Sequence, residues 1–164
     1  MRRLILALVA VLSLAACASV QRLGAANDVH ALLVSIRDND QSAFEAHVDR
    51  PALKQAIQAM IEQKGAKRYG ALASLLAPGI AQFAGDTLVQ PAVFKQVARQ
   101  YGYSDDTKIP NPLLIAQALK PLPDGRVCAT RKKDGPCTLV FTKEAGTWKL
   151  TGFQGDVKDL RLKL

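Results

Sequence analysis

Apolar residues recur at helical spacing through the first two thirds of the chain and alternate with polar residues in the last third. Four apolar side chains share one face of residues 28–38, and Asn27 before them is a good N-cap, so we predict a helix there. The same reasoning predicts a second helix capped by Asp40 and running to about Val48, and a third capped by Asp49 and running to about Gly65. Further helices are predicted over 69–89 with a break at Pro78-Gly79, from Pro91 to about Tyr101, and over 113–119.

The region after Pro123 follows the period of β-strands. Three strands are predicted over 126–131, 137–142 and 147–153, with turns between them at glycine-containing segments, and the tail over 160–164 alternates as an edge strand would. The fold class is therefore α+β: five or six short helices within about 27–120, packed on a C-terminal antiparallel meander of three to four strands within about 125–164. Neither layer can bury its apolar face alone, so we expect the two to pack together.

The first residues have the composition of a secretory leader. Arg2 and Arg3 are followed by a charge-free apolar run from Leu4 to Ala16, which is too short to span a bilayer, and then by Cys17. Leu14-Ala15-Ala16-Cys17 resembles the lipobox of bacterial lipoproteins. The alternatives are an ordinary secretory leader or a buried helix.

The lipobox resemblance implies a division of the chain and an address. Residues 1–16 would be a signal peptide, 17–26 the lipidated Cys17 with a tether, and 27–164 a single α+β domain. Acyl chains on Cys17 would anchor the protein to a membrane, facing the periplasm. Ala18 stands where an aspartate retains many such proteins at the inner membrane, so the outer membrane is favoured over the inner.

Cys128 and Cys137 remain once Cys17 is lipidated. An even pair in an oxidising compartment indicates a disulfide, and the two residues flank one predicted hairpin loop, facing each other or lying diagonally. Free thiols or half a metal site are the alternatives, but no Cys-Xaa-Xaa-Cys is present, so we predict no metal site.

The chain is basic, with a formal net charge of +8. In the mature chain the basic excess lies wholly after Asp106, and outside the cytosol its available partners are anionic lipid or cell-wall groups, not nucleic acid. A solvated strand face is the alternative. No nucleophile, phosphate-loop or dinucleotide motif occurs, and we expect no catalytic residues and no cofactor. His47 with Glu45 and Asp49 is a weak candidate base; a surface histidine is the simpler interpretation.

Residues 69–89 are apolar on nearly every side and are broken at Pro78-Gly79. A core hairpin explains such a segment. The alternative is a lid over an apolar pocket lined by Leu75, Phe83 and Trp148, which would bind an apolar ligand or another envelope protein.

Phrases from both halves of the chain resemble one bacterial family, domain of unknown function 2939. They are residues 28–32, Val48-Asp49-Arg50-Pro51-Ala52-Leu53, residues 126–130 and Gly146-Thr147-Trp148-Lys149-Leu150. The resemblance would cover roughly 27–153 and implies fold and location but no site. The order of helices and meander also resembles the nuclear-transport-factor-two-like roll. We expect a non-catalytic binding or envelope-maintenance module; the alternatives are an enzyme with a small roll-type pocket and a structural tether.

Overall fold

The computed structural model describes residues 2–69, 79, 87, 89–100, 102–130 and 135–153 of the chain, with side chains described from residue 19 onward except for residues 60, 61, 63–69 and 100. The helices of this part are α1 (Arg2–Asp38), α2 (Gln41–Ala46), α3 (Arg50–Tyr69), α5 (Pro91–Gln100) and α6 (Pro112–Gln117). The strands are β1 (Leu119–Pro121), β2 (Val127–Thr130), β3 (Cys137–Glu144) and β4 (Thr147–Phe153). Helices precede an antiparallel sheet, so the predicted α+β class is confirmed.

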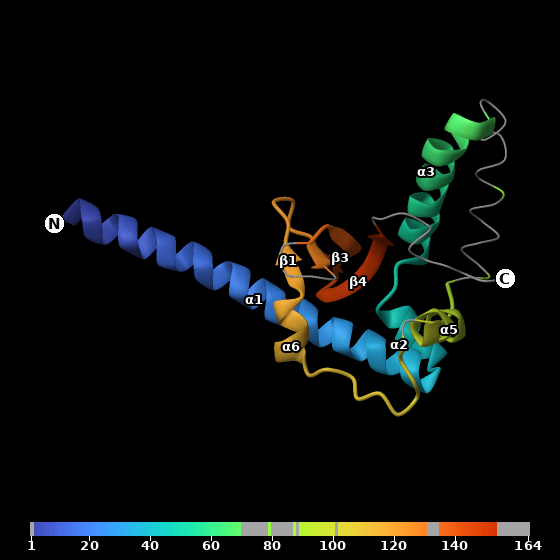
Figure 1. The fold of residues 1–164 in the computed structure, drawn as a ribbon. Helices are drawn as coiled ribbons and strands as arrows, with labels where there is room; N and C mark the ends of the chain where they lie inside the picture. Colours follow the sequence, from blue (N-terminus) through green and yellow to red (C-terminus); the bar gives the residue numbers. More distant parts are fainter. Residues whose placement is uncertain are drawn as a thin grey trace.

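Helix α1 is the element around which the domain is organised (Figure 1). It contacts α2, α5 and α6 and also packs against β1, β2 and β4. The prediction that the first helix runs over 28–38 with Asn27 as its N-cap is wrong, because the helix runs without interruption from Arg2 to Asp38. Leucine and alanine dominate the stretch before Asn27 and favour helix, so the chain does not need a cap there.

The predicted tether is partly built into the core. Ala25 and Ala26 are fully buried. Gly24 lies against the Trp148 side chain, where an added Cβ would come within 3.5 Å of Nε1. Residues 24–26 therefore pack inside the domain, although the division into leader, lipidated cysteine and domain stays a prediction.

The caps of the next two helices are confirmed. The Asp40 carboxylate accepts a hydrogen bond from the Ala43 amide at 3.0 Å and starts α2, and Asp49 accepts from the Ala52 amide at 3.0 Å at the start of α3. The predicted end of α3 at Gly65 is wrong, because the helix continues to Tyr69. A glycine costs a helix about 1 kcal/mol relative to alanine, which the helix formers around Gly65 can offset.

The four strands form a meander in the order β1-β2-β3-β4, with every pair antiparallel. The three strands expected from alternation are β2, β3 and β4. Sequence reasoning missed β1, because its residues were assigned to the end of the preceding helix and to the proline that stops it. Pro121 ends this edge strand, where a missing amide proton costs no ladder bond.

The free edge of β4 is partly satisfied by the connection between α2 and α3, where Val48 forms a parallel bridge with Leu150, and by one side chain of α1. The Leu150 amide donates to the His47 carbonyl at 2.9 Å, and the Asp49 amide donates to the Leu150 carbonyl at 3.0 Å. The Trp148 amide donates to the Asp28 carboxylate at 2.8 Å. These bonds pair groups that an open edge would leave to water or to another chain.

One core joins the helices to the sheet, as expected. From the helical side it contains Val29, Leu32, Phe44 and Leu53, and from the sheet Val127, Phe141, Trp148 and Leu150, all of them buried. Trp148 and Leu150 face this core, which confirms their predicted side of β4.

Two predicted elements lie outside the described residues: nearly all of the apolar segment 69–89 and the alternating tail 160–164. Within the part of the chain that the structure describes, no helix has a stretch long and apolar enough to cross a membrane.

Candidate functional site

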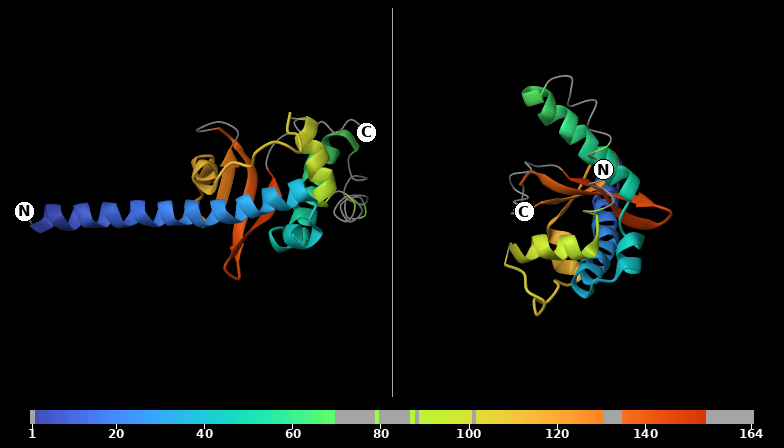
Figure 2. Two further views of the ribbon diagram at one scale, coloured as in Figure 1. Left: turned by 90° about the horizontal axis from the view of Figure 1, so that it is seen from below. Right: turned by 90° about the vertical axis from the view of Figure 1, so that its right-hand side faces the viewer.

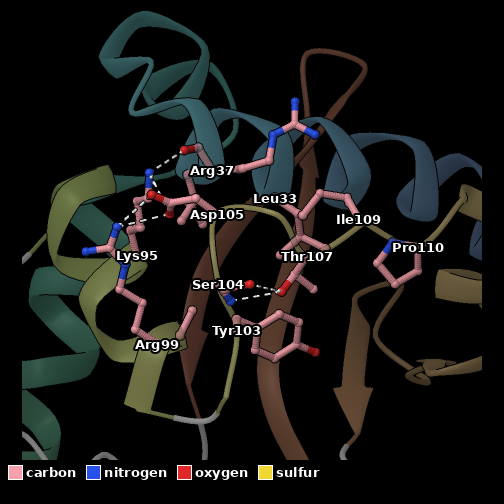
Figure 3. A pocket seen from close by; sticks show the side chains of 12 residues that line it. Leu33, Arg37, Lys95, Arg99, Tyr103, Ser104, Asp105, Thr107, Ile109 and Pro110 are labelled. Carbon is pink, nitrogen blue, oxygen red and sulfur yellow. Dashed lines mark hydrogen bonds and ion pairs between the residues drawn. The ribbon is translucent and has the colours of Figure 1, made fainter.

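A cavity of about 230 Å³ lies between the C-terminal half of α1, helix α5 and the loop of residues 102–111, which we call the pocket loop. Figure 3 shows its lining side chains. Leu33, Ile36, Ala98, Ile109 and Pro110 supply most of its apolar wall. Tyr103, Ser104, Asp105 and Thr107 come from the pocket loop, and Arg37, Lys95 and Arg99 from the two helices.

A carboxylate fastens the pocket loop to α5. Lys95 and Arg99 are one helical turn apart and so lie on one face of α5. Asp105 accepts from both: its Oδ1 lies 3.0 Å from Lys95 Nζ, and its Oδ2 lies 2.8 Å from an Arg99 guanidinium nitrogen. The two cations converge on this one carboxylate (Figure 3).

Lys95 also ties α5 to α1. Its Nζ donates to the Arg37 carbonyl at 2.8 Å, in the last turn of α1. A cation there satisfies an otherwise free carbonyl and interacts favourably with the helix dipole. One lysine therefore joins all three walls of the cavity.

The start of the pocket loop is held to α5, because the amides of Gly102 and Tyr103 donate to the carbonyls of Arg99 at 3.1 Å and Ala98 at 3.2 Å. The rest is held by its own polar groups and by one bond to α1. The Ser104 amide donates to the Thr107 hydroxyl at 2.8 Å, and the Thr107 amide donates to the Ser104 carbonyl at 3.0 Å. Near the end of the loop, the Pro110 carbonyl accepts from His30 Nδ1 at 2.9 Å. The loop is thus fixed at its middle by Asp105 and near its end by His30.

The charges around the cavity are paired. Hydrogen bonds from Lys95 and then from Arg99 hold the pKa of Asp105 below its ordinary value. The Arg37 guanidinium lies 2.7 Å from Asp38 and lowers the pKa of that carboxyl by its hydrogen bond. A ligand would therefore meet an apolar interior with polar groups already engaged with one another.

Several polar side chains of the cavity lining bond to one another. The cavity lining contains no histidine or cysteine, and its serine and threonine bond to each other. No cluster of metal-ligating side chains occurs among the described residues. At about 230 Å³ the cavity falls below the usual range for drug-sized ligands and fits a short alkyl chain or a single ring.

The predicted disulfide is confirmed. Cys128 and Cys137 are bonded, with their Cα atoms 5.6 Å apart. The bridge is diagonal, because Cys128 stands opposite Val140 and Cys137 opposite Thr130, and the register shifts beside Thr130. It joins β2 to β3 away from the cavity.

The predicted apolar pocket stays a prediction. Leu75 and Phe83 lie outside the described residues, and Trp148 is buried in the core and does not line the cavity. Cys17 lies within α1, and its lipidation stays a prediction.

His47 has a different neighbour from the two considered in the sequence. Its Nδ1 lies 3.7 Å from Asp28 Oδ1 and makes no hydrogen bond to the described residues. Asp49 caps α3, and Glu45 pairs with Arg50 at 3.0 Å. Glu45 and Asp49 are therefore engaged with other partners, and the His47 side chain is 15% exposed, so it is partly buried and not fully on the surface.

Sequence reasoning missed the cavity entirely. The lysine and arginine one turn apart on α5, followed by Asp105-Asp106 in a polar loop, were the available pattern. That pattern indicates a loop folded back on a helix, but it does not reveal that α1 closes the third side.

The model of one family matches residues 10–97, more than half of the chain; its description is Protein of unknown function (DUF2939). The chain belongs to this family. No curated protein and no solved structure matches the chain.

The family match spans α1 from residue 10, then α2, α3 and most of α5. The Val48–Leu53 phrase lies inside it, whereas the phrases at 126–130 and 146–150 lie beyond it. The range of 27–153 expected from the sequence therefore extends too far at its C-terminal end. The matched part of the DUF2939 protein supplies the α1 wall of the cavity and Lys95.

Proposed function

We propose that this DUF2939 protein is an envelope lipoprotein, anchored by acyl chains on Cys17, whose domain is a non-catalytic binding module for a small apolar group. The single observation that supports the binding role is the cavity between α1, α5 and the pocket loop, because its apolar wall is combined with polar groups that are already paired.

The sequence supports the proposed address. A basic head, a short apolar run and small residues before Cys17 are what lipoprotein processing requires. Ala18 after the cysteine favours the outer membrane, with the domain facing the periplasm. The Cys128–Cys137 bridge is consistent with that oxidising compartment.

The anchor is tested by replacing its attachment atom. In cells fed a radiolabelled fatty acid, the unaltered protein should incorporate label and fractionate with the outer membrane. Cys17→Ser should incorporate none, because a serine hydroxyl is not a substrate for thioether formation. Equal labelling of the two proteins would refute the anchor.

The binding role is tested by filling the cavity. Ala98→Phe places a ring into the cavity from α5, and Ala92→Phe adds the same ring to an exposed position on the same helix. A series of n-alkanols titrated by NMR should bind the unaltered protein and Ala92→Phe alike. Ala98→Phe should lose that binding while keeping the dispersed spectrum of a folded protein. Equal binding by both variants, or no binding by the unaltered protein, would exclude this cavity as the site.

A further inference from the structure

Four large apolar side chains are exposed at one end of the domain. Val20 and Leu23 on α1 are 73% and 42% exposed, and Leu113 and Leu114 on α6 are 67% and 54% exposed. We call these four residues the end patch.

Hydrogen bonds place α6 alongside the first packed turns of α1. Before α6, the Pro110 carbonyl accepts from His30; after it, the Gly125 carbonyl accepts from Gln21 Nε2 at 2.8 Å. The chain between these two points runs back along α1, and α6 packs against that helix. Leu113 and Leu114 therefore lie beside the stretch of α1 that begins next to Val20 and Leu23.

Helices α1 and α6, which carry the end patch, lie side by side where α1 leaves the domain (Figures 1 and 2). Figures 1 and 2 show the N-terminal part of α1 projecting beyond the sheet, with α6 among the parts of the domain nearest to that projection. Tyr103, the other large apolar side chain that is exposed among the described residues, belongs to the pocket loop.

An exposed leucine pair on so short a helix has no role in the core. Ile115, the next residue of α6, is buried and already supplies that contact. Contiguous exposed apolar groups mark surfaces that meet a membrane or a partner.

The position of Cys17 decides which occupant fits. Val20 follows Cys17 by three residues in one continuous helix, which is about 4.5 Å along the axis. Acyl chains on Cys17 would hold a bilayer surface at this end of the molecule. The exposed Lys120 follows α6, so a basic group accompanies the apolar ones, as anionic headgroups favour.

We propose that the end patch is the surface by which the anchored domain rests on the phospholipid bilayer. Val20 and Leu23 enter the interface beside the acyl chains, and Leu113 and Leu114 add a second contact that fixes the orientation of the domain. This proposal depends on the proposed function, because it needs Cys17 to be acylated.

The test uses the acylated protein in vesicles of phosphatidylethanolamine and phosphatidylglycerol. Leu114→Cys and, as the matched control, Tyr103→Cys are labelled with an environment-sensitive nitrobenzoxadiazole dye; both positions are exposed, and Cys128 and Cys137 are bridged. On vesicles, the dye at Leu114 should shift to the blue and be quenched by spin-labelled lipid, whereas the dye at Tyr103 should do neither. Identical behaviour of the two dyes would overturn the proposal.

A second measurement removes the anchor from the comparison. In the Cys17→Ser background, Leu113→Ser with Leu114→Ser should weaken cosedimentation with the same vesicles by about tenfold, and Tyr103→Ser should leave it unchanged. Equal cosedimentation of the two variants would contradict the patch.

The outcomes separate the two proposals. A mass spectrum without acyl chains on Cys17 would overturn the anchor. Acylated protein whose Leu114 dye stays solvent-exposed on vesicles would overturn the end patch alone. A blue shift that grows with protein concentration and needs no vesicles would assign the patch to a second copy of the chain, and this would also overturn the membrane contact.

Discussion

Two segments of this DUF2939 protein are fastened by different chemistry. Strands β2 and β3 are joined by the Cys128–Cys137 bond, and β3 places Val140 and Phe141 in the buried interior. The pocket loop, by contrast, has an exposed carboxylate at its middle, held by Lys95 and Arg99, and it covers a cavity instead of a filled core.

The disulfide between β2 and β3 stabilises the fold, whereas the ion pairs of Asp105 set the position of the pocket loop at the cavity. A covalent bridge restricts the unfolded chain and acts at any salt concentration or pH in an oxidising medium. Exposed ion pairs add little to global stability, and their strength changes with salt concentration and with pH. We therefore expect the sheet to persist under conditions that open the pocket loop.

The largest effect is expected from removing the disulfide. Its cysteines are 9 residues apart, so Cys128→Ala with Cys137→Ala should lower the free energy of unfolding by about 2–3 kcal/mol in the chain-entropy model. Urea titration followed by Trp148 fluorescence measures this change. Alkanol binding in the cavity should survive below the unfolding transition. Loss of binding by the still-folded variant would show that the two regions are coupled.

Features that depend on neighbouring residues could be predicted from the sequence. Asp40 and Asp49 were recognised as caps because a cap needs only the amide three residues ahead. Strands β2, β3 and β4 followed from alternation and turn residues. The disulfide followed from two cysteines at the ends of one hairpin and from the expected compartment.

Features that depend on distant partners could not be predicted. Strand β1 is short and ends in Pro121, and only its pairing with β2 makes it a strand. The cavity is formed by α1, α5 and a loop far along the chain. The Asp28 carboxylate accepts a hydrogen bond from the Trp148 amide, although the two residues are 120 positions apart in the sequence. In each case the feature depends on a contact between distant residues, and no pattern in the neighbouring sequence indicates that contact.

A smaller and more local effect is expected from Asp105→Ala. Without this carboxylate, Lys95 and Arg99 lose the partner that connects them to the pocket loop, whereas the core keeps all its contacts. Hydrogen exchange followed by mass spectrometry should show faster exchange in residues 102–111 and unchanged exchange in β3 and β4. The matched control is Asp106→Ala, which removes the adjacent exposed carboxylate. If the two variants exchange alike, Asp105 is not the residue that fastens the pocket loop to α5.

The smallest effect needs no substitution and follows from the lowered pKa of Asp105. Because Lys95 and Arg99 hold that pKa below the ordinary value of 3.8, the ionised carboxylate stabilises the closed loop above that pH. The contribution is lost as the pH falls from there through the lower pKa of the folded state, where the carboxyl takes up a proton.

Asp38 beside Arg37 and Asp124 beside Arg126 also have lowered pKa values, so the measurement must report on the pocket loop alone. Amide shifts of Tyr103 and Ser104 followed by NMR should titrate in this acid range in the unaltered protein but not in Asp105→Asn, which carries no titrating group at that position. Persistence of the same transition in Asp105→Asn would assign it to another carboxyl. A transition in β2 or β3 at the same pH would show that the sheet responds to acid as the loop does, and that the contrast between the covalent and the ionic fastening does not hold.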